Sequence, residues 1–177
     1  MMIFARSYHS SPGTRELCHK IKESKSEEDV AKAAEEMASF IVSANAIPER
    51  SAFIPAPQRS GKAGYTLVLA GKIAEKTGGF VADILGREPG LSIYEERKAG
   101  RMAGLRLFLE APVPDARHLF FVDNVLCEGR TFLAARDLVG ERLLPLVYAV
   151  DEEMSGIAGA LSSSNIELVV LGKHIHH

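Results

Sequence analysis

The chain has 177 residues, with 21 Lys and Arg against 23 Asp and Glu, and a formal net charge of −2. This length suffices for one domain with a full hydrophobic core, and the charge argues against a protein that binds nucleic acid by bulk positive charge. No stretch approaches the roughly 20 apolar residues that cross a membrane, and Cys18 and Cys127 indicate neither a disulfide framework nor a cysteine-based zinc motif. With no secretory signal pattern at the N-terminus, we expect a single domain, residues 1–177, in a reducing, cytoplasmic location.

The first 24 residues predict a strand and a short helix. Residues 2–8 can form a strand, and the run Ser-Ser-Pro-Gly at residues 10–13 ends it. Residues 14–22 then place apolar side chains on one side of a helix and basic side chains on the other. This helix is either an ordinary amphipathic surface helix or part of a small N-terminal cap, residues 1–24, over an active site.

A second helix is predicted from its first turn and its apolar stripe. Ser26 is a candidate N-cap, and acidic residues follow it, where the helix dipole favours negative charge. The helix runs to about Ser43, and the side chains expected in the core are Val30, Ala33, Ala34, Met37, Ile41 and Ala44. Residues 51–54 then predict a short strand.

The stretch after that strand, P-A-P-Q-R-S-G-K-A-G-Y at residues 55–65, carries hydrogen-bond donors and positive charge. Its donors are Gln58, Arg59, Ser60 and Lys62. Gly61 and Gly64 allow tight backbone turns. The stretch departs from a P-loop at two positions, because Ala56 and Ala63 replace the required Gly and the required Ser or Thr. A loop that takes pyrophosphate without a P-loop fits better, and a solvated basic loop is the alternative.

A helix at residues 65–76 and a strand at residues 80–85 follow, separated by two glycines. Residues 86–105 are rich in glycine and charge and have weak periodicity. Because connections this long inside a compact domain are often lids or binding loops, we expect a long flexible lid that carries Arg97. A partly disordered surface loop is the alternative. Residues 106–110 predict a returning strand.

The most informative stretch is residues 119–131, L-F-F-V-D-N-V-L-C-E-G-R-T. Its apolar start is typical of a strand buried on both faces, and Asp123 and Asn124 end the apolar run. A short loop with Gly129 leads into a helix with apolar residues on one face, namely Phe132, Ala135, Val139 and Leu143. Ligands of open α/β sheets bind at the carboxyl ends of strands, and a helix N-terminus favours phosphate. An ordinary strand–turn–helix with an Asp-Asn turn is the alternative.

The rest of the chain adds two strands. Residues 144–150 predict a buried strand, residues 156–161 a helical turn and residues 166–171 a last strand. Because strands alternate with helices, the pattern predicts an α/β fold with a mostly parallel sheet and helices on both faces. The lack of an early G-x-G-x-x-G argues against the dinucleotide-binding version. The histidines within residues 174–177 favour a polar tail over a metal site.

Residues 119–131 resemble the phosphoribosyl-pyrophosphate (PRPP) signature of type I phosphoribosyltransferases, which is an apolar strand, two acidic residues and a Thr-Thr-Gly-x-Thr-like loop. Three further stretches resemble ComF-like members of that family, in the same order along the chain. They are H-S-S-P-G-T-R-E-L-C-H-K-I-K at residues 9–22, F-I-P-A-P-Q-R-S-G-K-A-G-Y-T-L-V-L-A at residues 53–70 and L-S-I-Y-E-E-R-K-A-G at residues 91–100. The zinc-binding cysteine segment common at the front of that family is missing, so a role in DNA uptake is not carried over.

The resemblance implies the type I phosphoribosyltransferase fold and an enzyme, a pentosyltransferase, that moves the phosphoribosyl group of PRPP to a small nitrogenous acceptor and releases pyrophosphate. It implies that Asp123 and Asn124 are the catalytic pair at the ribose. The residues implied at the 5′-phosphate are Val125, Leu126, Cys127, Glu128, Gly129, Arg130 and Thr131. Those implied at the pyrophosphate are Gln58, Arg59, Ser60 and Arg97. Mg2+ would be held mainly by substrate and water, and the resemblance is compatible with a homodimer.

Three departures from the family signature support a second hypothesis from another class. Asn124 is an amide where the family usually has an acid, and Cys127 and Glu128 stand where it often has hydroxyls. These changes fit a non-catalytic module that senses PRPP or a nucleotide and regulates a partner. A third interpretation, an α/β phosphatase with Asp123 as nucleophile, is weaker because the usual D-x-D pattern is absent.

Overall fold

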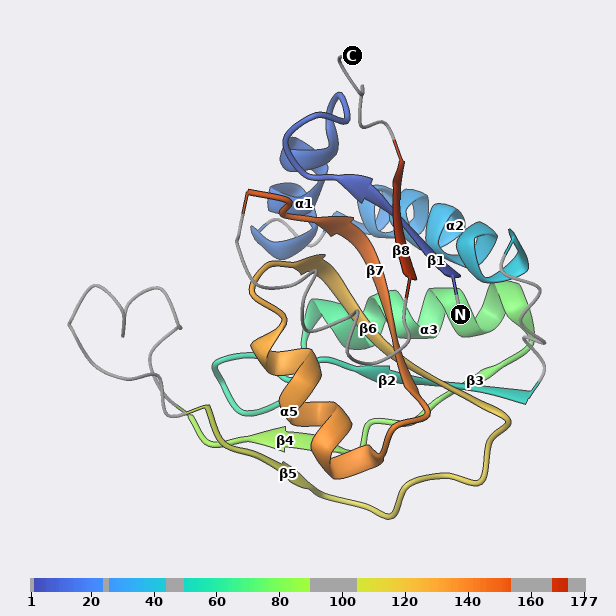
Figure 1. The fold of residues 1–177 in the computed structure, drawn as a ribbon, viewed down its shortest axis with the longest axis vertical. Helices are drawn as coiled ribbons and strands as arrows, with labels where there is room; N and C mark the ends of the chain where they lie inside the picture. The colour runs from blue at the N-terminus through green and yellow to red at the C-terminus, as the bar shows by residue number, and fades with distance from the viewer. Residues whose placement is uncertain (1, 24–25, 44–49, 90–104, 154–166, 172–177) are drawn as a thin grey trace.

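A computed structural model of the chain describes residues 2–23, 26–43, 50–89, 105–153 and 167–171. They form an α/β fold with a six-stranded, parallel sheet in the order β3-β2-β6-β7-β1-β8 and a two-stranded antiparallel sheet, β4-β5 (Figure 1). The strands are β1 (Met2–Ser7), β2 (Ser51–Pro55), β3 (Phe80–Val81), β4 (Leu85–Arg87), β5 (Leu107–Leu109), β6 (His118–Leu126), β7 (Leu143–Val150) and β8 (Glu167–Leu171). The helices are α1 (Thr14–Glu23), α2 (Glu27–Ser43), α3 (Tyr65–Thr77) and α5 (Arg130–Val139).

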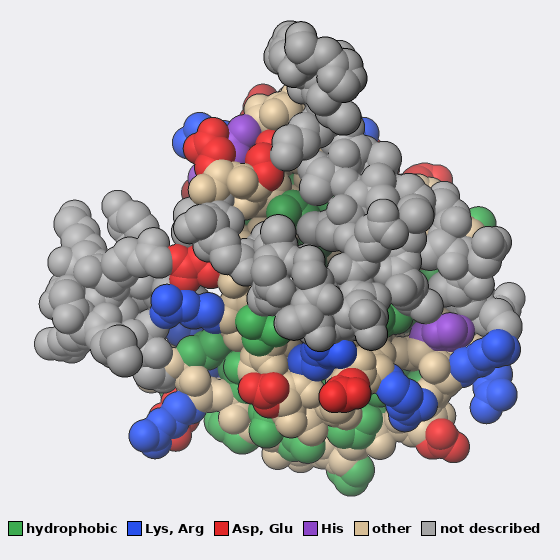
Figure 2. Space-filling model, in the orientation of Figure 1, with side chains coloured by type: hydrophobic (Ala, Val, Ile, Leu, Met, Phe, Trp, Pro, Cys, Tyr) green, Lys and Arg blue, Asp and Glu red, His purple; other side chains and the backbone are tan. Residues whose placement is uncertain are grey.

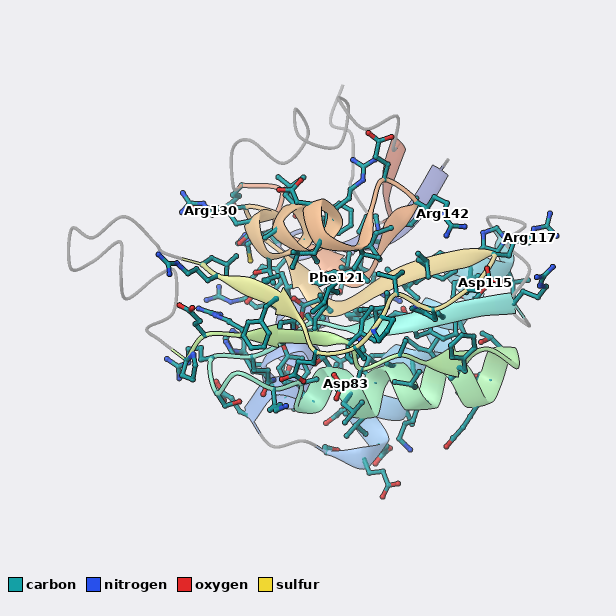
Figure 3. The ribbon with its side chains drawn as sticks, turned by 90° about the horizontal axis from the view of Figure 1, so that it is seen from below. Asp83, Asp115, Arg117, Phe121, Arg130 and Arg142 are labelled. Carbon is teal, nitrogen blue, oxygen red and sulfur yellow. The ribbon has the colours of Figure 1, made fainter. Side chains whose placement is uncertain are left out.

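Helices cover both faces of the large sheet, as the sequence predicts. On one face, apolar residues of α1, α2 and α3 pack over Phe53 and Phe120, whose rings stack 5.7 Å apart. On the other face, α5 packs Phe132 against Phe121, with ring centroids 5.7 Å apart, and β4 joins the same core (Figure 3). Phe120 and Phe121 are consecutive in β6, so their opposite directions explain the continuous apolar run of that strand.

Helices α2 and α3 begin and end where their local sequence signals predict. Ser26 caps α2, because its hydroxyl accepts a hydrogen bond from the backbone N–H of Asp29 at 3.3 Å. The predicted stripe on α2 is buried, apart from Ala44, which lies outside the described residues. Gly78 ends α3 in the left-handed conformation, with φ 73°, and its N–H donates to the carbonyl of Ala74.

Two predicted elements differ from the structure. The strand predicted at residues 80–85 is two strands, because the chain turns after β3 and β4 pairs with β5 instead of with the large sheet. Leu143 does not continue the face of α5. The helix ends at Gly140, which has φ 110°, and Leu143 begins β7.

Several predicted segments fall partly or wholly outside the described residues. Of the predicted lid, residues 86–87 belong to β4 and residues 90–104 are outside. The helical turn predicted at residues 156–161 and the histidine-rich tail are also outside. None of the helices in the described ranges is long and apolar enough to cross a membrane. Basic and acidic side chains are interspersed on the described face that carries α5, in agreement with the small net charge (Figure 2).

Candidate functional site

The candidate site lies at the carboxyl edge of the large sheet, where β2, β6, β7 and β1 all end. The sequence predicts Asp123 at the end of its strand, but β6 continues to Leu126. The partner strands explain the difference. β2 stops at Pro55, opposite Val122, whereas β7 pairs with β6 as far as Leu126. Residues 123–126 therefore project beyond β2 and face the loop that follows it.

The Asp123 carboxylate is partly buried and held from one side. Its Oδ1 accepts hydrogen bonds from the backbone N–H of Asn124 at 2.8 Å and from the Tyr65 hydroxyl at 3.2 Å. Among the described residues both of its hydrogen bonds end at Oδ1, which leaves Oδ2 for a ligand. Burial raises the pKa of Asp123 to about 6, and the two hydrogen bonds and the charge of Lys22 act in the opposite direction.

Asn124 lies next to Asp123 but uses its side chain inside the protein. It is only 6% exposed. Its Oδ1 accepts from the Tyr65 hydroxyl at 2.9 Å, and its Nδ2 donates to the backbone carbonyl of Cys18 in α1 at 3.2 Å. An ionised Asp here would place a carboxylate against the Cys18 carbonyl oxygen, so an amide suits this position. The structure thus brings the predicted pair together and gives its two members different partners.

Tyr65 is a residue of this site that the sequence does not reveal. It is the first residue of α3 and is 8% exposed. Its partners Asp123 and Asn124 are 58 and 59 residues away along the chain. Burial and the Asp123 charge raise the pKa of Tyr65, whereas a hydrogen bond from Gln58 lowers it. The only signal in the sequence is the glycine followed by an aromatic residue at a helix start.

The β2–α3 loop (residues 56–64) is tightly built. The N–H of Gly61 donates to the carbonyl of Gln58 at 2.9 Å, and the N–H of Gln58 donates to the carbonyl of Lys62 at 3.0 Å. Gly61 has φ 98°, and its carbonyl accepts from the N–H of Arg87 in β4 at 3.0 Å. The Gln58 side chain lies over Gly64, and Arg59 and Ser60 are exposed at the tip of the loop.

Lys62 forms an ion pair with a residue outside the loop. Its Nζ lies 2.7 and 2.8 Å from the two carboxylate oxygens of Glu110, which follows β5. This ion pair and the Arg87 hydrogen bond attach the β2–α3 loop to the β4–β5 hairpin. The described start of the predicted lid, residues 86–89, therefore lies beside the loop predicted to take pyrophosphate. Arg97, predicted to reach the same loop, is outside the described residues.

The β6–α5 loop (residues 127–129) leads into α5 through Gly129. Gly129 has φ 74° and stands at the N-cap position, where no side chain caps the helix. Glu128 and Arg130 neutralise each other, with Oε2 and Nε 2.9 Å apart. Desolvation and the nearby charges of Asp151 and Asp123 raise the pKa of the surface-exposed Cys127 thiol, so this sulfur is a neutral thiol near pH 7.

The other residues predicted at the 5′-phosphate fall into two kinds. The side chains of Val125 and Leu126 pack into the two cores, so only their backbone faces the edge. Thr131 lies in the first turn of α5, beside Arg130. Figure 3 shows Arg130 at the end of α5 nearest this edge, whereas Arg117 and Arg142 lie toward the opposite edge of the sheet.

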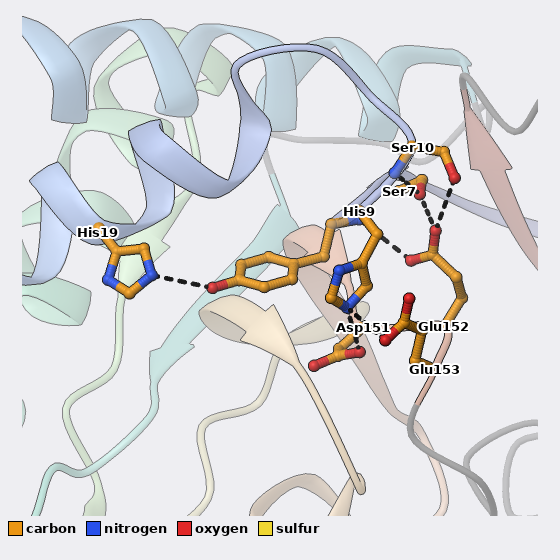
Figure 4. A network of polar contacts seen from close by, with 8 residues as sticks. Ser7, His9, Ser10, His19, Asp151, Glu152 and Glu153 are labelled. Carbon is orange, nitrogen blue, oxygen red and sulfur yellow. Dashed lines mark hydrogen bonds and ion pairs between the residues drawn. The ribbon is translucent and has the colours of Figure 1, made fainter.

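A second polar network joins the ends of β1 and β7 (Figure 4). The Glu152 carboxylate accepts hydrogen bonds from the Ser7 hydroxyl, from the backbone N–H of Tyr8 at 3.2 Å and from the Ser10 hydroxyl at 3.3 Å. His9 Nε2 lies 2.9 Å from an Asp151 oxygen. These contacts fix the segment that leads into α1, the helix whose Cys18 carbonyl binds Asn124.

No model of a known protein family matches the chain, and no curated protein matches it. A functional argument therefore depends on the residues at the carboxyl edge. They are one partly buried carboxylate, two glycine-containing loops that enter helix N-termini, and a tyrosine that contacts the carboxylate. Among the described residues there is no cluster of three or more His, Cys, Asp or Glu side chains that could hold a metal ion.

Proposed function

We propose that the chain is a type I phosphoribosyltransferase, a pentosyltransferase that transfers the phosphoribosyl group of PRPP to a small nitrogenous acceptor and releases pyrophosphate. The observation that carries this proposal is the position of Asp123 between the β2–α3 loop and the β6–α5 loop at one sheet edge. PRPP needs three contacts in a row: a diphosphate site, a ribose site and a monophosphate site. Free cysteines at positions 18 and 127 fit a reducing, cytoplasmic setting.

In this proposal Asp123 accepts hydrogen bonds from the ribose hydroxyls through Oδ2 and faces the positive charge that develops at C1 when pyrophosphate leaves. The backbone N–H groups of residues 129–131 and the α5 dipole hold the 5′-phosphate. Gln58, Arg59 and Ser60 meet the pyrophosphate. Residues 86–105, which begin in β4 and lead to β5, act as the lid that brings Arg97 to the same group.

The site offers a magnesium ion one protein ligand. Asp123 offers one hard carboxylate oxygen, and Mg2+ in phosphoryl sites commonly takes one or two carboxylates and completes its shell with substrate oxygens and water. When bound, the ion supplies charge neutralisation for the diphosphate leaving group. Asp123 therefore keeps its role as the ribose contact whether or not it also touches the ion.

One observation favours a non-catalytic, PRPP- or nucleotide-sensing module as the second candidate. Asn124, which takes the place of the second acid, is committed to Tyr65 and Cys18, and so offers little to a substrate. A sensor needs binding without turnover. Pyrophosphate release with a panel of nitrogenous bases separates the two functions, because the enzyme releases it with at least one base and the sensor with none.

Isothermal calorimetry with PRPP, with and without magnesium, tests what both candidates share. We expect magnesium-dependent binding, and we expect Asp123→Asn to weaken it. Asp137→Asn is the matched control, because Asp137 is exposed in the last turn of α5 and its change removes the same charge. Absence of heat and of thermal stabilisation at millimolar PRPP would sink the proposed function in both forms.

A further inference from the structure

Tyr65, the residue after the β2–α3 loop, contacts a strand that lies far from it in sequence. Its hydroxyl oxygen is 3.2 Å from Asp123 Oδ1 and 2.9 Å from Asn124 Oδ1, both in β6. The Gln58 side chain of the β2–α3 loop lies over Gly64, the residue that precedes Tyr65. Asn124 extends the chain of contacts to α1 through the Cys18 carbonyl. Tyr65 thus lies where the loop predicted for pyrophosphate meets the carboxylate predicted for ribose, and Asn124 connects it to the N-terminal helix.

The single hydroxyl proton of Tyr65 fixes the direction of the hydrogen bonds at this site. A tyrosine hydroxyl has one proton to give and lone pairs that accept. Asn124 cannot turn its amide over, because its Nδ2 must face the Cys18 carbonyl, so its Oδ1 always presents an acceptor to Tyr65. The Tyr65 proton is therefore shared between Asp123 and Asn124. A change in how strongly Asp123 attracts this proton alters the sharing.

We propose that Tyr65 is a positioning residue that couples the two halves of the site, an inference that rests on the proposed function. The hydroxyl fixes Asp123 by its Oδ1, so that Oδ2 faces the ribose. Tyr65 directly follows the β2–α3 loop, whose Gln58 side chain lies over Gly64, so the same residue links Asp123 to that loop. Magnesium pyrophosphate on that loop orders Gln58, orders Tyr65 and so prepares Asp123. Pyrophosphate and ribose 5-phosphate consequently bind with positive cooperativity.

Tyr65→Phe is the direct test, because it keeps the buried ring and removes only the hydroxyl. The ribose 5-phosphate affinity is measured by calorimetry with and without saturating magnesium pyrophosphate. We expect the wild type to bind at least about five-fold more tightly with pyrophosphate, the lower end of usual coupling between sites. In Tyr65→Phe this ratio falls to about one. Tyr148→Phe, which removes another buried tyrosine hydroxyl, keeps the wild-type ratio.

A readout without ligand tests the positioning role by itself. Carbon NMR of the Asp123 carboxyl follows its titration in the free protein. The Tyr65 hydrogen bond favours the charged form, so its loss raises the Asp123 pKa in Tyr65→Phe, whereas Tyr148→Phe leaves it in place. An unchanged titration would overturn the positioning role. If Tyr65→Phe does not fold, Gln58→Met breaks the loop side of the junction, and a cooperative ratio that survives in it overturns the coupling.

Failure of this inference can be distinguished from failure of the proposed function. If the wild type binds neither ribose 5-phosphate nor PRPP, the proposed function and the coupling both fail, and the Asp123 titration still decides the positioning role. If the wild type binds each ligand but without cooperativity, only the coupling is overturned. Cooperativity that persists in Tyr65→Phe assigns the link to another residue and also overturns the inference.

Discussion

The β2–α3 loop and the β6–α5 loop each connect the end of a parallel strand to the first turn of a helix, but they balance their charges differently. Lys62 reaches out of the first loop to Glu110, at the base of the β4–β5 hairpin. Glu128 pairs with Arg130, two residues further along the same turn. The first loop is thereby attached to another part of the molecule, whereas the second is balanced internally.

The difference suggests that the two loops have different roles in the proposed reaction. In the proposed function, a loop attached to the hairpin suits a leaving group that must be enclosed and later released. A loop balanced within itself, followed by a ten-residue helix, suits a phosphate that stays attached to the ribose throughout. Asp123 lies between the two, and Tyr65 connects it to the first.

The largest expected effect is on turnover, at the residue between the loops. Asp123→Asn keeps the side-chain shape, loses the charge and replaces one acceptor oxygen with a donor. We expect turnover with PRPP to fall by about 10²–10³, the usual cost of losing one electrostatic contact to a transition state. The measurement is pyrophosphate release with a working acceptor, beside Asp137→Asn. Wild-type turnover in Asp123→Asn would show that Asp123 is only a turn residue.

The tight build of the β2–α3 loop gives the next largest effect. Gly61 has φ 98°, and a Cβ there would lie 2.9 Å from the backbone oxygen of Arg87. We expect Gly61→Ala to destabilise the fold by about 2–3 kcal/mol, from left-handed strain together with the clash. Gly71 in α3 is the matched control, because a Cβ there meets nothing within 4 Å. Gly71→Ala should stabilise by roughly 0.5–1 kcal/mol.

Urea unfolding of these two variants gives opposite signs if the β2–α3 loop is rigid. A Gly61→Ala midpoint equal to that of the wild type would mean that the loop yields easily. The first loop would then differ from the second in charge alone, and its attachment to the hairpin would not make it rigid.

The third prediction concerns pH and the free protein. Burial places the Asp123 pKa near 6 in the fold, above its ordinary value of 3.8. The stability that this group contributes is therefore fully present below about pH 4 and is lost as the pH rises through 6. Asp123→Asn should be more stable than the wild type by about 1–2 kcal/mol at pH 7.5, after allowance for partial exposure, and the difference should vanish near pH 4. Melting curves across this range decide it, and a pH-independent difference would contradict a buried, titrating carboxylate.

The sequence predicts the parts of this molecule that depend on local pattern. The stripe of α2 and the apolar run of β6 indicate their elements because burial on one or both faces repeats at the period of a helix or a strand. It does not predict that β6 continues through Asp123 and Asn124, since pairing with β7 decides that. The glycine followed by an aromatic residue at the start of α3 is the only signal for Tyr65. It does not predict the contact with Asp123, because that contact depends on how α3 packs against a strand 58 residues away.

The smallest expected effect concerns the internal balance of the β6–α5 loop. Glu128→Thr removes the carboxylate that pairs with Arg130 and adds a hydroxyl, so Arg130 and the N–H groups of the first turn of α5 face an added phosphate with one negative charge fewer nearby. We expect ribose 5-phosphate to bind about three- to five-fold more tightly, equivalent to roughly 1 kcal/mol or less. Asp137→Thr is the control, because it changes the net charge equally from an exposed position on the same helix and should leave the affinity within error. Calorimetry at two salt concentrations adds a check, since a gain due to charge shrinks as ionic strength rises. If Glu128→Thr weakens binding, the Glu128–Arg130 pair is what holds the loop in its binding conformation, and the contrast between the two loops would be one of rigidity instead of charge.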